Sequence, residues 1–431
     1  MQQKPVKIFA SGKTPRLAYI AELILHDILG LSWEIITDKR KIGKNPVINY
    51  TDGNIPGSLK MSPDVLLFEQ GVRPVDIDAD EFMGVPYFFK SSPDSDLPFD
   101  VFAASFYLVS RYEEYQECRT VYAGQFKASD SVAYRCGFLE ISVVEIWSKM
   151  LAKALATRFY KLTFKPGDFK AIASFNINDP FSGYGRNILG NIAELLRDIA
   201  GRKVRENSAA EDRSATSEMM DYFTGILSKH GTDSIFFFPV GDQSRQEKSP
   251  SWKNSDYRKV ICSFHESHPV GIYSSASASV SYASAAKETA RMKKITGKDV
   301  IINRFSFSHL VMPASYRHIS ALGIREDYSM GYDDHPGFRA GLSRPFLFYD
   351  LYEEQITRLR IYPFQMTDHA LRNLTGQDLQ NAKSLIGGII REVRRAGGTF
   401  VSVWNDDSFF DDSATDFFRA IFEFTLGVQN Q

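Results

Sequence analysis

At 431 residues the chain exceeds a typical single domain, and its 43% hydrophobic and 24% charged residues are ordinary for globular proteins. The formal net charge of −1 gives no sign of the basic face that duplex-binding proteins carry, so nucleic acid is not an expected partner. Since no apolar run reaches about 18 residues and the first residues show no signal-peptide pattern, neither a membrane span nor secretion is expected. The three cysteines are scattered without a CxxC pair, which fits a reducing, cytoplasmic location.

Residues 1–150 are predicted to form a small layered α/β domain. Strands are expected at Pro5–Ala10, Trp33–Thr37 and Val47–Tyr50. A helix follows the first strand, with Thr14 as its N-cap and Gly30 at its end. A second apolar helix is predicted over Phe99–Tyr115. Strands that alternate with helices indicate a layered α/β architecture.

Residues 151–431 are predicted to form a larger α/β domain. Its buried strands are expected at Phe169–Phe175, Ser234–Val240, Pro269–Ile272, Val300–Asn303, Leu359–Tyr362 and Thr399–Trp404. Helices are expected at Ile188–Ala200, Ser281–Ile295 and Asp378–Ala396, and Arg202–Ser217 is expected to be a flexible surface loop. Such alternation favours a parallel sheet rolled into a distorted (β/α) barrel.

Polar residues follow these strands where a barrel of parallel strands would hold its site. They are Asn176, Asn178, Asp179, Tyr273, Arg304, Ser306, Tyr362, Asn405, Asp406 and Asp407. A long loop at Glu326–Arg344, which contains Asp334, His335 and Arg339, is expected to cover the barrel mouth. We therefore expect these side chains to converge on one pocket.

Four segments carry a family resemblance that spans nearly the whole chain. They read FDVFAASFYLVSRYEEY, SIFFFPVGD, EDYSMGYDDHPGFRAGLSRPF and GGTFVSVWNDD. The sequence resembles the polysaccharide deacetylase family, and within it a bacterial branch in which a small α/β domain precedes the deacetylase domain. The resemblance implies a distorted (β/α) barrel and metal-dependent removal of acetyl groups from amino sugars. In that chemistry two histidines and a carboxylate hold a divalent metal, and a second carboxylate takes a proton from the attacking water.

The chain departs from the family pattern at the residues that the chemistry needs. The Phe-Asp-x-Asp motif aligns with Phe175-Asn176-Ile177-Asn178, so both carboxylates become amides. The expected histidines fall on Tyr273, Ser306 and Tyr362, and the final acid motif falls on Asn405 and Asp407. An amide cannot accept a proton at neutral pH, and a tyrosine is a weak ligand because its pKa is about 10. With these substitutions, the resemblance implies a pseudoenzyme with the deacetylase fold, for which we expect no metal or other cofactor. We expect it to retain a pocket for a glycan or an acetylated sugar.

Other interpretations stay open at this point. Asn176 and Asn178 are also typical of turns between a strand and a loop. Tyr273 and Tyr362 are also compatible with a hydrophobic core. Arg304 and Arg339 are also typical of ion pairs that stabilise the fold. An active hydrolase with a rebuilt oxygen-rich site would draw on Asp179, Asp406, Asp407 and His335, and would suit Mg²⁺, Mn²⁺ or Ca²⁺. A structural scaffold with a vestigial pocket is the third alternative. The oligomeric state is not indicated by the sequence.

Overall fold

The computed structural model describes residues 4–116, 126–165, 167–181, 222–243, 249–306, 309–409 and 414–429. The predicted helix Ile188–Ala200 and the predicted loop Arg202–Ser217 lie outside these residues. No helix within them is both long and apolar enough to cross a membrane.

The first part of the chain is built on a small parallel sheet with strand order β2-β1-β3-β4. Its strands are β1 (Val6–Ala10), β2 (Trp33–Ile36), β3 (Val47–Tyr50) and β4 (Leu59–Lys60). The helices are α1 (Pro15–Ala21), which continues as the π-helical η1 (Glu22–Ile28), α2 (Val101–Val109), α3 (Val132–Arg135) and α4 (Val143–Arg158). A hairpin of β5 (Asp80–Phe82) and β6 (Val85–Tyr87) completes this part.

Local sequence chemistry explains where the first helix starts. The Thr14 hydroxyl accepts a hydrogen bond from the backbone N–H of Leu17 (3.1 Å), and Pro15 occupies the first turn, where its missing N–H costs nothing. The second predicted helix is shorter than expected. It ends at Val109, and a 3₁₀ turn, η4 (Tyr112–Tyr115), follows after Arg111 at φ 56° interrupts the helical path.

The larger part contains a nine-stranded sheet with order β12-β13-β11-β10-β9-β8-β7-β15-β14 among the described residues. The strands, in that order, are Phe346–Asp350, Gln355–Ile361, Glu326–Asp327, Ile302–Phe305, Val270–Ser274, Asp233–Phe238, Lys170–Asn176, Thr399–Asn405 and Met366–Thr367. Every pairing is parallel except that of β12 with β13. In the described part of the chain the edge strands β12 and β14 do not pair with each other, so closure into a barrel stays a prediction.

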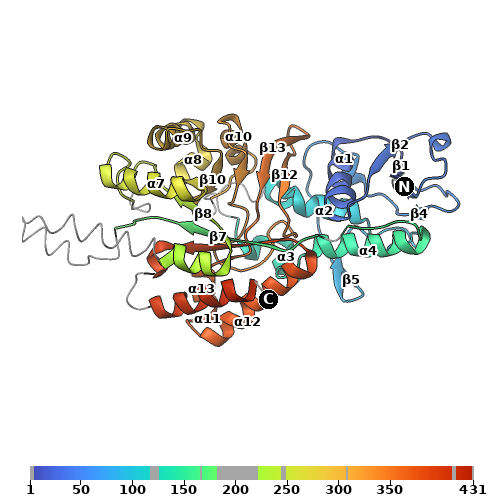
Figure 1. Cartoon of the computed structure of the whole chain (residues 1–431). Helices are drawn as coiled ribbons and strands as arrows, with labels where there is room; N and C mark the ends of the chain where they lie inside the picture. The colour runs from blue at the N-terminus through green and yellow to red at the C-terminus, as the bar shows by residue number, and fades with distance from the viewer. Residues whose placement is uncertain are drawn as a thin grey trace, which may run out of the picture.

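Helices cover the sheet on both sides. They are α7 (Ser255–Ser267), α8 (Ala276–Val280), α9 (Tyr282–Thr296), α10 (Ala314–Ala321), α11 (Asp368–Thr375), α12 (Leu379–Ala396) and α13 (Thr415–Gln429). Figure 1 shows α7–α10 on one side of strands β7 and β8, and α11–α13 on the other. The apolar face of α12 explains its position, because Ile386, Ile390 and Val393 recur at helical spacing and are buried.

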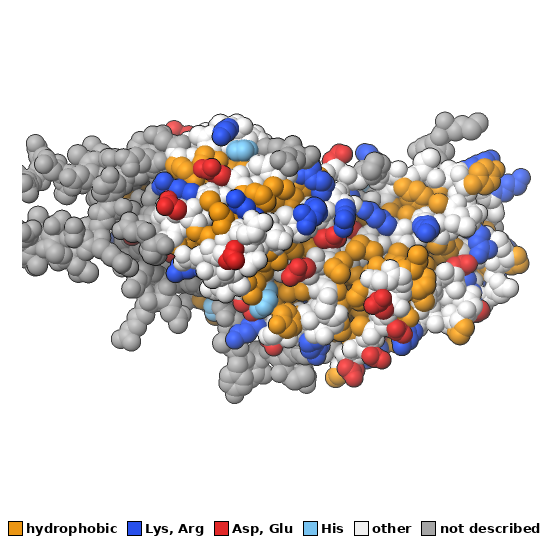
Figure 2. Space-filling view, turned by 90° about the horizontal axis from the view of Figure 1, so that it is seen from below, with side chains coloured by type: hydrophobic (Ala, Val, Ile, Leu, Met, Phe, Trp, Pro, Cys, Tyr) orange, Lys and Arg blue, Asp and Glu red, His pale blue; other side chains and the backbone are white. Residues whose placement is uncertain are grey.

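One hydrophobic cluster runs through both parts of the chain. Tyr19 of α1 and Phe106 of α2 pack their rings against Tyr349 of β12, with centroids 5.0 and 5.3 Å from its ring. The predicted boundary at residue 150 falls inside α4, so the division into two domains stays a prediction. The face seen in Figure 2 carries charges of both signs interspersed with apolar patches, in keeping with the net charge of −1.

Candidate functional site

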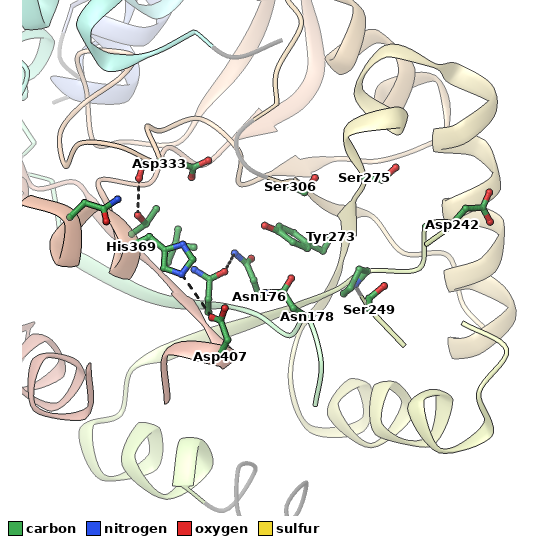
Figure 3. Close-up of a pocket in the computed structure, with 16 residues that line it drawn as sticks. Asn176, Asn178, Asp242, Ser249, Tyr273, Ser275, Ser306, Asp333, His369 and Asp407 are labelled. Carbon is green, nitrogen blue, oxygen red and sulfur yellow. Dashed lines mark hydrogen bonds and ion pairs between the residues drawn. The ribbon is translucent and has the colours of Figure 1, made fainter. Parts of the chain in front are cut away.

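A cavity of about 420 Å³ opens where several parallel strands end. Most of the side chains around it come from β14, from α11 and from the ends of β7, β8, β9, β10 and β15 (Figure 3), and Ser249 and Asp333 come from segments between these elements. They are Asn176, Asn178, Pro239, Gly241, Asp242, Ser249, Tyr273, Ser275, Ser306, Asp333, Thr367, His369, Asn373, Val403, Asn405 and Asp407. The carboxyl ends of parallel strands are the usual place for a ligand in such folds.

Two amides at the floor of this cavity are held by buried charges on either side. Arg304 donates through Nη1 to Asn176 Oδ1 (3.1 Å), and Asn176 Nδ2 donates to Asn405 Oδ1 (3.0 Å). Asn405 in turn donates from its backbone N–H and its Nδ2 to the two carboxylate oxygens of Asp368, each at 2.7 Å. All four side chains are buried, so a buried cation and a buried anion fix the orientation of both amides.

Arg304 lies beneath the cavity rather than in its lining. Its other donors reach Ser174 Oγ (2.8 Å) and the carbonyl of Tyr328 (3.0 Å), and its guanidinium lies over the ring of Phe237, 4.3 Å from the centroid. Burial lowers the pKa of Arg304 to about 10. The prediction that Arg304 faces the pocket is therefore corrected, because a buried guanidinium must use its donors on protein acceptors.

A second buried carboxylate, Asp406, lies behind the lining. Its oxygens accept hydrogen bonds from the backbone N–H of Asp179 (2.9 Å) and from the Asn178 side chain (3.4 Å). Burial, followed by repulsion from Asp407, raises the pKa of Asp406 to about 7. Asp406 and Asp179 thus hold the two strand ends together and do not line the cavity, contrary to their predicted role in the pocket.

His369 and Asp407 form a pair at the rim of the cavity. Nε2 of His369 lies 3.9 Å from Oδ1 of Asp407, and both side chains are about half exposed. His369 belongs to the first turn of α11, whose N-cap Thr367 accepts from the backbone N–H of Ala370 (3.0 Å). The neighbouring strand β14 has only two residues and no detectable periodicity, so the strand-end analysis missed His369.

On the far side of the cavity, Asp242 follows β8 and is neutralised by two cations. Lys287 and Arg291 of α9 lie 2.8 and 2.5 Å from its oxygens and lower its pKa to about 2. Tyr273 extends into the cavity from β9 between these groups and the amides (Figure 3). Asp242 was missed by the sequence analysis, although the segment SIFFFPVGD that contains it was noted.

The structure places four further predicted pocket residues, Tyr362, Asp334, His335 and Arg339, away from the lining. Tyr362 stacks on Tyr328 with centroids 4.5 Å apart, and burial raises its pKa. His335 packs edge-on against Tyr134 of α3 (5.2 Å), and Asp334 lies beside it, at 3.5 Å from Nδ1. Of this loop only Asp333 reaches the cavity.

Arg339, the fourth of these residues, points away from the cavity and toward the first part of the chain. Its guanidinium pairs with Glu114 of η4 and donates to the carbonyl of Gly331 (3.0 Å), and it is 1% exposed. The segment Glu326–Arg344 is therefore largely a buried connection to the first part of the chain, and the prediction that it covers the cavity mouth is wrong. The segment contains three glycines, and at least one of them is required by close packing. A Cβ at Gly331 would lie 2.4 Å from the Phe364 ring.

The described residues of the cavity do not fit a metal held by histidines and carboxylates. Within the described chain, three such donor atoms come together only at Glu22, His26 and Asp27, which are exposed on the first part of the molecule. At the cavity, the residues in the expected ligand positions are amides, a tyrosine and a serine, of which the amides are engaged with protein partners. A structural or catalytic zinc site needs three or four such ligands around one point.

A family model and several solved structures have partial likeness to the chain. A family model described as "Family of unknown function (DUF7033)" matches residues 6–160. No curated protein matches the sequence. Solved structures with partial likeness include a protein described as a polysaccharide deacetylase from Mycobacterium smegmatis, at 13% identity and TM-score 0.36, covering 62% of this chain and 88% of that one.

Two further solved structures come from the same class. A polysaccharide deacetylase from Bacillus cereus has 12% identity and TM-score 0.26, covering 59% of this chain and 85% of that chain. A mutant of a CE4 family pseudoenzyme with restored enzymatic activity has 12% identity and TM-score 0.24, covering 56% and 68%. These three structural neighbours of the mixed α/β chain are thus polysaccharide deacetylases or a variant of a CE4 family pseudoenzyme.

Proposed function

We propose that this chain is a polysaccharide-deacetylase-like protein that binds a carbohydrate in the cavity without metal-dependent deacetylation. The observation that carries the proposal is the amide pair Asn176–Asn405, held between Arg304 and Asp368. These amides occupy strand ends where the family resemblance expects acids.

The pair supports loss of catalysis because neither amide can act as a base. Both ends of the Asn176 amide are engaged, Oδ1 with Arg304 and Nδ2 with Asn405. An amide has no proton-accepting form at neutral pH, and losing a positioned base typically costs about 10²–10⁴-fold in rate. The neighbouring carboxylate Asp406 is 1% exposed and accepts hydrogen bonds from protein groups, so it does not replace that base.

The lining supports retention of a binding site. It combines amides and hydroxyls, such as Asn178, Ser306 and Thr367, with the ring of Tyr273. Hydroxyl-rich ligands need such donors and acceptors, and an aromatic ring offers an apolar surface to one face of a sugar. A volume of about 420 Å³ lies within the usual range for small-molecule pockets, roughly 300–1,000 Å³.

The test measures metal, hydrolysis and binding on the full chain. Purified protein is loaded in turn with Zn²⁺, Co²⁺, Ni²⁺ and Mn²⁺ and analysed for bound metal, and acetate release from N-acetylglucosamine oligomers is followed. Glycan binding is measured by ligand-observed NMR, with Tyr273→Ala as the site variant and Tyr282→Ala, which alters an exposed tyrosine of α9, as the matched control.

We expect no stoichiometric metal, no acetate release, and glycan binding that Tyr273→Ala abolishes and Tyr282→Ala retains. One metal per chain with acetate release would instead establish a rebuilt hydrolase. If no glycan binds, the proposed carbohydrate-binding function is overturned, and a structural scaffold with a vestigial pocket becomes the leading alternative.

A further inference from the structure

The hairpin of β5 and β6 carries an exposed methionine at its tip. Met83 and Gly84 form its two-residue loop, and both have positive φ, 55° and 76°. Such a loop usually has asparagine, aspartate or glycine in the first position, because a left-handed backbone is unfavourable for larger side chains. Met83 is 71% exposed, so contacts within its own chain offset little of this strain. A strained, exposed apolar residue is a candidate for a contact with another molecule.

The hairpin is held firmly against the rest of the chain. Nε1 of the buried Trp147 in α4 donates to the Pro86 carbonyl of β6 (3.0 Å), and the Trp147 ring packs edge-on against Phe88 (5.4 Å). The carboxylate of Asp80 in β5 lies 3.2 Å from Nζ of Lys90, beyond β6. Figure 1 shows β5 projecting from the body of the molecule beside α4. The tip is therefore presented in a fixed position, which reduces the entropy lost on association.

An apolar groove of about 290 Å³ lies between this hairpin and α4. Its apolar lining comes from Phe82, Met83, Leu97, Met150 and Ala154, and its polar lining from Asp96, Lys153, Thr157 and Arg158. Methionine is flexible and polarisable, so it fits irregular apolar surfaces of this kind. One surface thus holds both a projecting apolar side chain and an apolar hollow next to it.

Charges of opposite sign lie on the two sides of the groove. The hairpin and the segment before it expose four acids, Asp76, Asp78, Asp80 and Glu81, whereas α4 exposes Lys153 and Arg158. Asp80 and Arg158 pair within the chain, with Lys90 and Asp96. The exposed Glu81 and Lys153 therefore represent the two signs best. A two-fold rotation that exchanges tip and groove brings the acidic hairpin of one copy toward the basic helix of the other.

On this basis we propose that the surface binds a second copy of the same chain. In the resulting two-fold dimer, Met83 of each copy occupies the groove of the other. An interface of this symmetry uses the same surface twice, so that surface must carry both the inserted side chain and its receptor. The dimer is independent of the carbohydrate-binding function proposed above.

The first test measures the oligomeric state of the full chain by sedimentation velocity. Loading concentrations span roughly 1–100 μM, the range in which modest interfaces dissociate. Met83→Asn keeps a residue that tolerates the left-handed turn, so its thermal midpoint should not fall below that of the unchanged chain. Its dimer dissociation constant should rise about tenfold or more, as for loss of a central interface side chain. Val280→Asn changes a 62% exposed residue of α8 and should leave the constant unchanged.

The second test uses the symmetry of the interface. Glu81→Lys and Lys153→Glu should each weaken self-association, since each sets like charges together at both halves of the interface. An equal mixture of the two variants pairs Lys with Glu at one half and keeps the native pair at the other. The mixture should therefore associate more tightly than either variant alone, with a dissociation constant close to that of the unchanged chain.

Three results would overturn the proposal. One is a monomer throughout the concentration range. Another is a dimer that Met83→Asn leaves intact, because its interface would lie elsewhere. The third is a mixture of the charge variants that associates no better than its components, since the hairpin and α4 would then not face each other across the two-fold axis.

Discussion

Arg339 and Glu114, which are 225 residues apart in the chain, form a buried two-point ion pair. Nε and Nη2 of Arg339 donate to the two carboxylate oxygens of Glu114 at 2.9 and 2.8 Å. Arg111 also donates to Glu114 (2.7 Å) and to the Arg339 carbonyl. Burial alone would raise the pKa of Glu114, but the two guanidinium groups lower it below its usual value.

Neutralising Glu114 should destabilise the chain strongly. In Glu114→Gln the guanidinium groups of Arg339 and Arg111 lose the carboxylate that balances them, and breaking a buried pair typically costs about 3–5 kcal/mol. Equilibrium unfolding in urea measures the loss. Glu392→Gln removes a partly exposed pair with Arg395 and should cost less than about 1 kcal/mol. A loss of similar size in both variants would contradict the structural role of Glu114.

Glu145 should make stability depend on pH. It is fully buried, its Oε1 accepts from the N–H (2.8 Å) and hydroxyl (2.9 Å) of Ser343, and burial raises its pKa to about 7. The folded state thus holds a proton that the unfolded state releases above about pH 4.5. The stabilising contribution is complete below that pH and is lost as pH rises to about 7.

Glu145→Gln should therefore flatten the decline in unfolding free energy between pH 5 and pH 8. The contribution of Glu145 to that decline is expected to be on the order of 1–3 kcal/mol. Denaturant titrations at several pH values measure the decline. Glu140→Gln changes an exposed carboxylate shortly before α4, the helix that contains Glu145. It should leave the decline in unfolding free energy between pH 5 and pH 8 unchanged. An unchanged decline in Glu145→Gln would show that other groups cause it.

The two amides of the cavity should respond differently to the same substitution. Asn176→Asp places a carboxylate against the Arg304 guanidinium and should change stability by no more than about 1 kcal/mol, because a new ion pair offsets the lost hydrogen bond to Asn405. Asn405→Asp removes the donor to Asp368 and sets two buried carboxylates together. That variant should lose about 2–4 kcal/mol at pH 7.

The unfolding free energies of both variants are compared at pH 5 and pH 7. Part of the loss in Asn405→Asp should recover at pH 5, since one proton shared between adjacent carboxylates relieves their repulsion. Equal losses of unfolding free energy in the two variants would mean that the charges of Arg304 and Asp368 do not determine the orientation of the Asn176 and Asn405 amides.

Gly337 should not tolerate a side chain. Its φ is 147°, and a Cβ there would lie 2.6 Å from the carbonyl oxygen of Leu139, a backbone atom that cannot move alone. Gly337→Ala should lower the thermal midpoint far more than Gly84→Ala. Gly84 also has a positive φ of 76°, but a Cβ there meets nothing within 4 Å, so only the cost of the left-handed backbone, about 1–2 kcal/mol, applies. Equal midpoints would argue against the close packing at Leu139.

The elements that the sequence predicted well are those with strong local signals. The Thr14 cap is confirmed, as is the end of α12, where Gly397 adopts φ 65°. Long buried strands such as β15 were found within a residue of their ends because uninterrupted apolar runs identify them. Their ends brought Asn176, Asn178, Tyr273, Ser306, Asn405 and Asp407 to one cavity, as the parallel arrangement predicts.

The remaining features depend on contacts between distant residues. Strands β11 and β14 have two residues each, too few for any periodicity. Arg339 and His335 were predicted as pocket residues because the loop that contains them was expected to cover the barrel mouth. Their orientation depends on the partners Glu114 and Tyr134, which are far away in the sequence. Charge and polarity alone do not reveal which side of a loop faces a ligand.

The segment Glu326–Arg344 has a consequence for how ligand binding would be sensed in the molecule. One short stretch of backbone carries Asp333 at the cavity and, six residues later, Arg339 in its pair with Glu114. Ordering of the cavity rim by a ligand would therefore slow local opening around η4 as well. Amide hydrogen exchange at Tyr112–Tyr115, remote from the sugar, should report occupancy of the cavity.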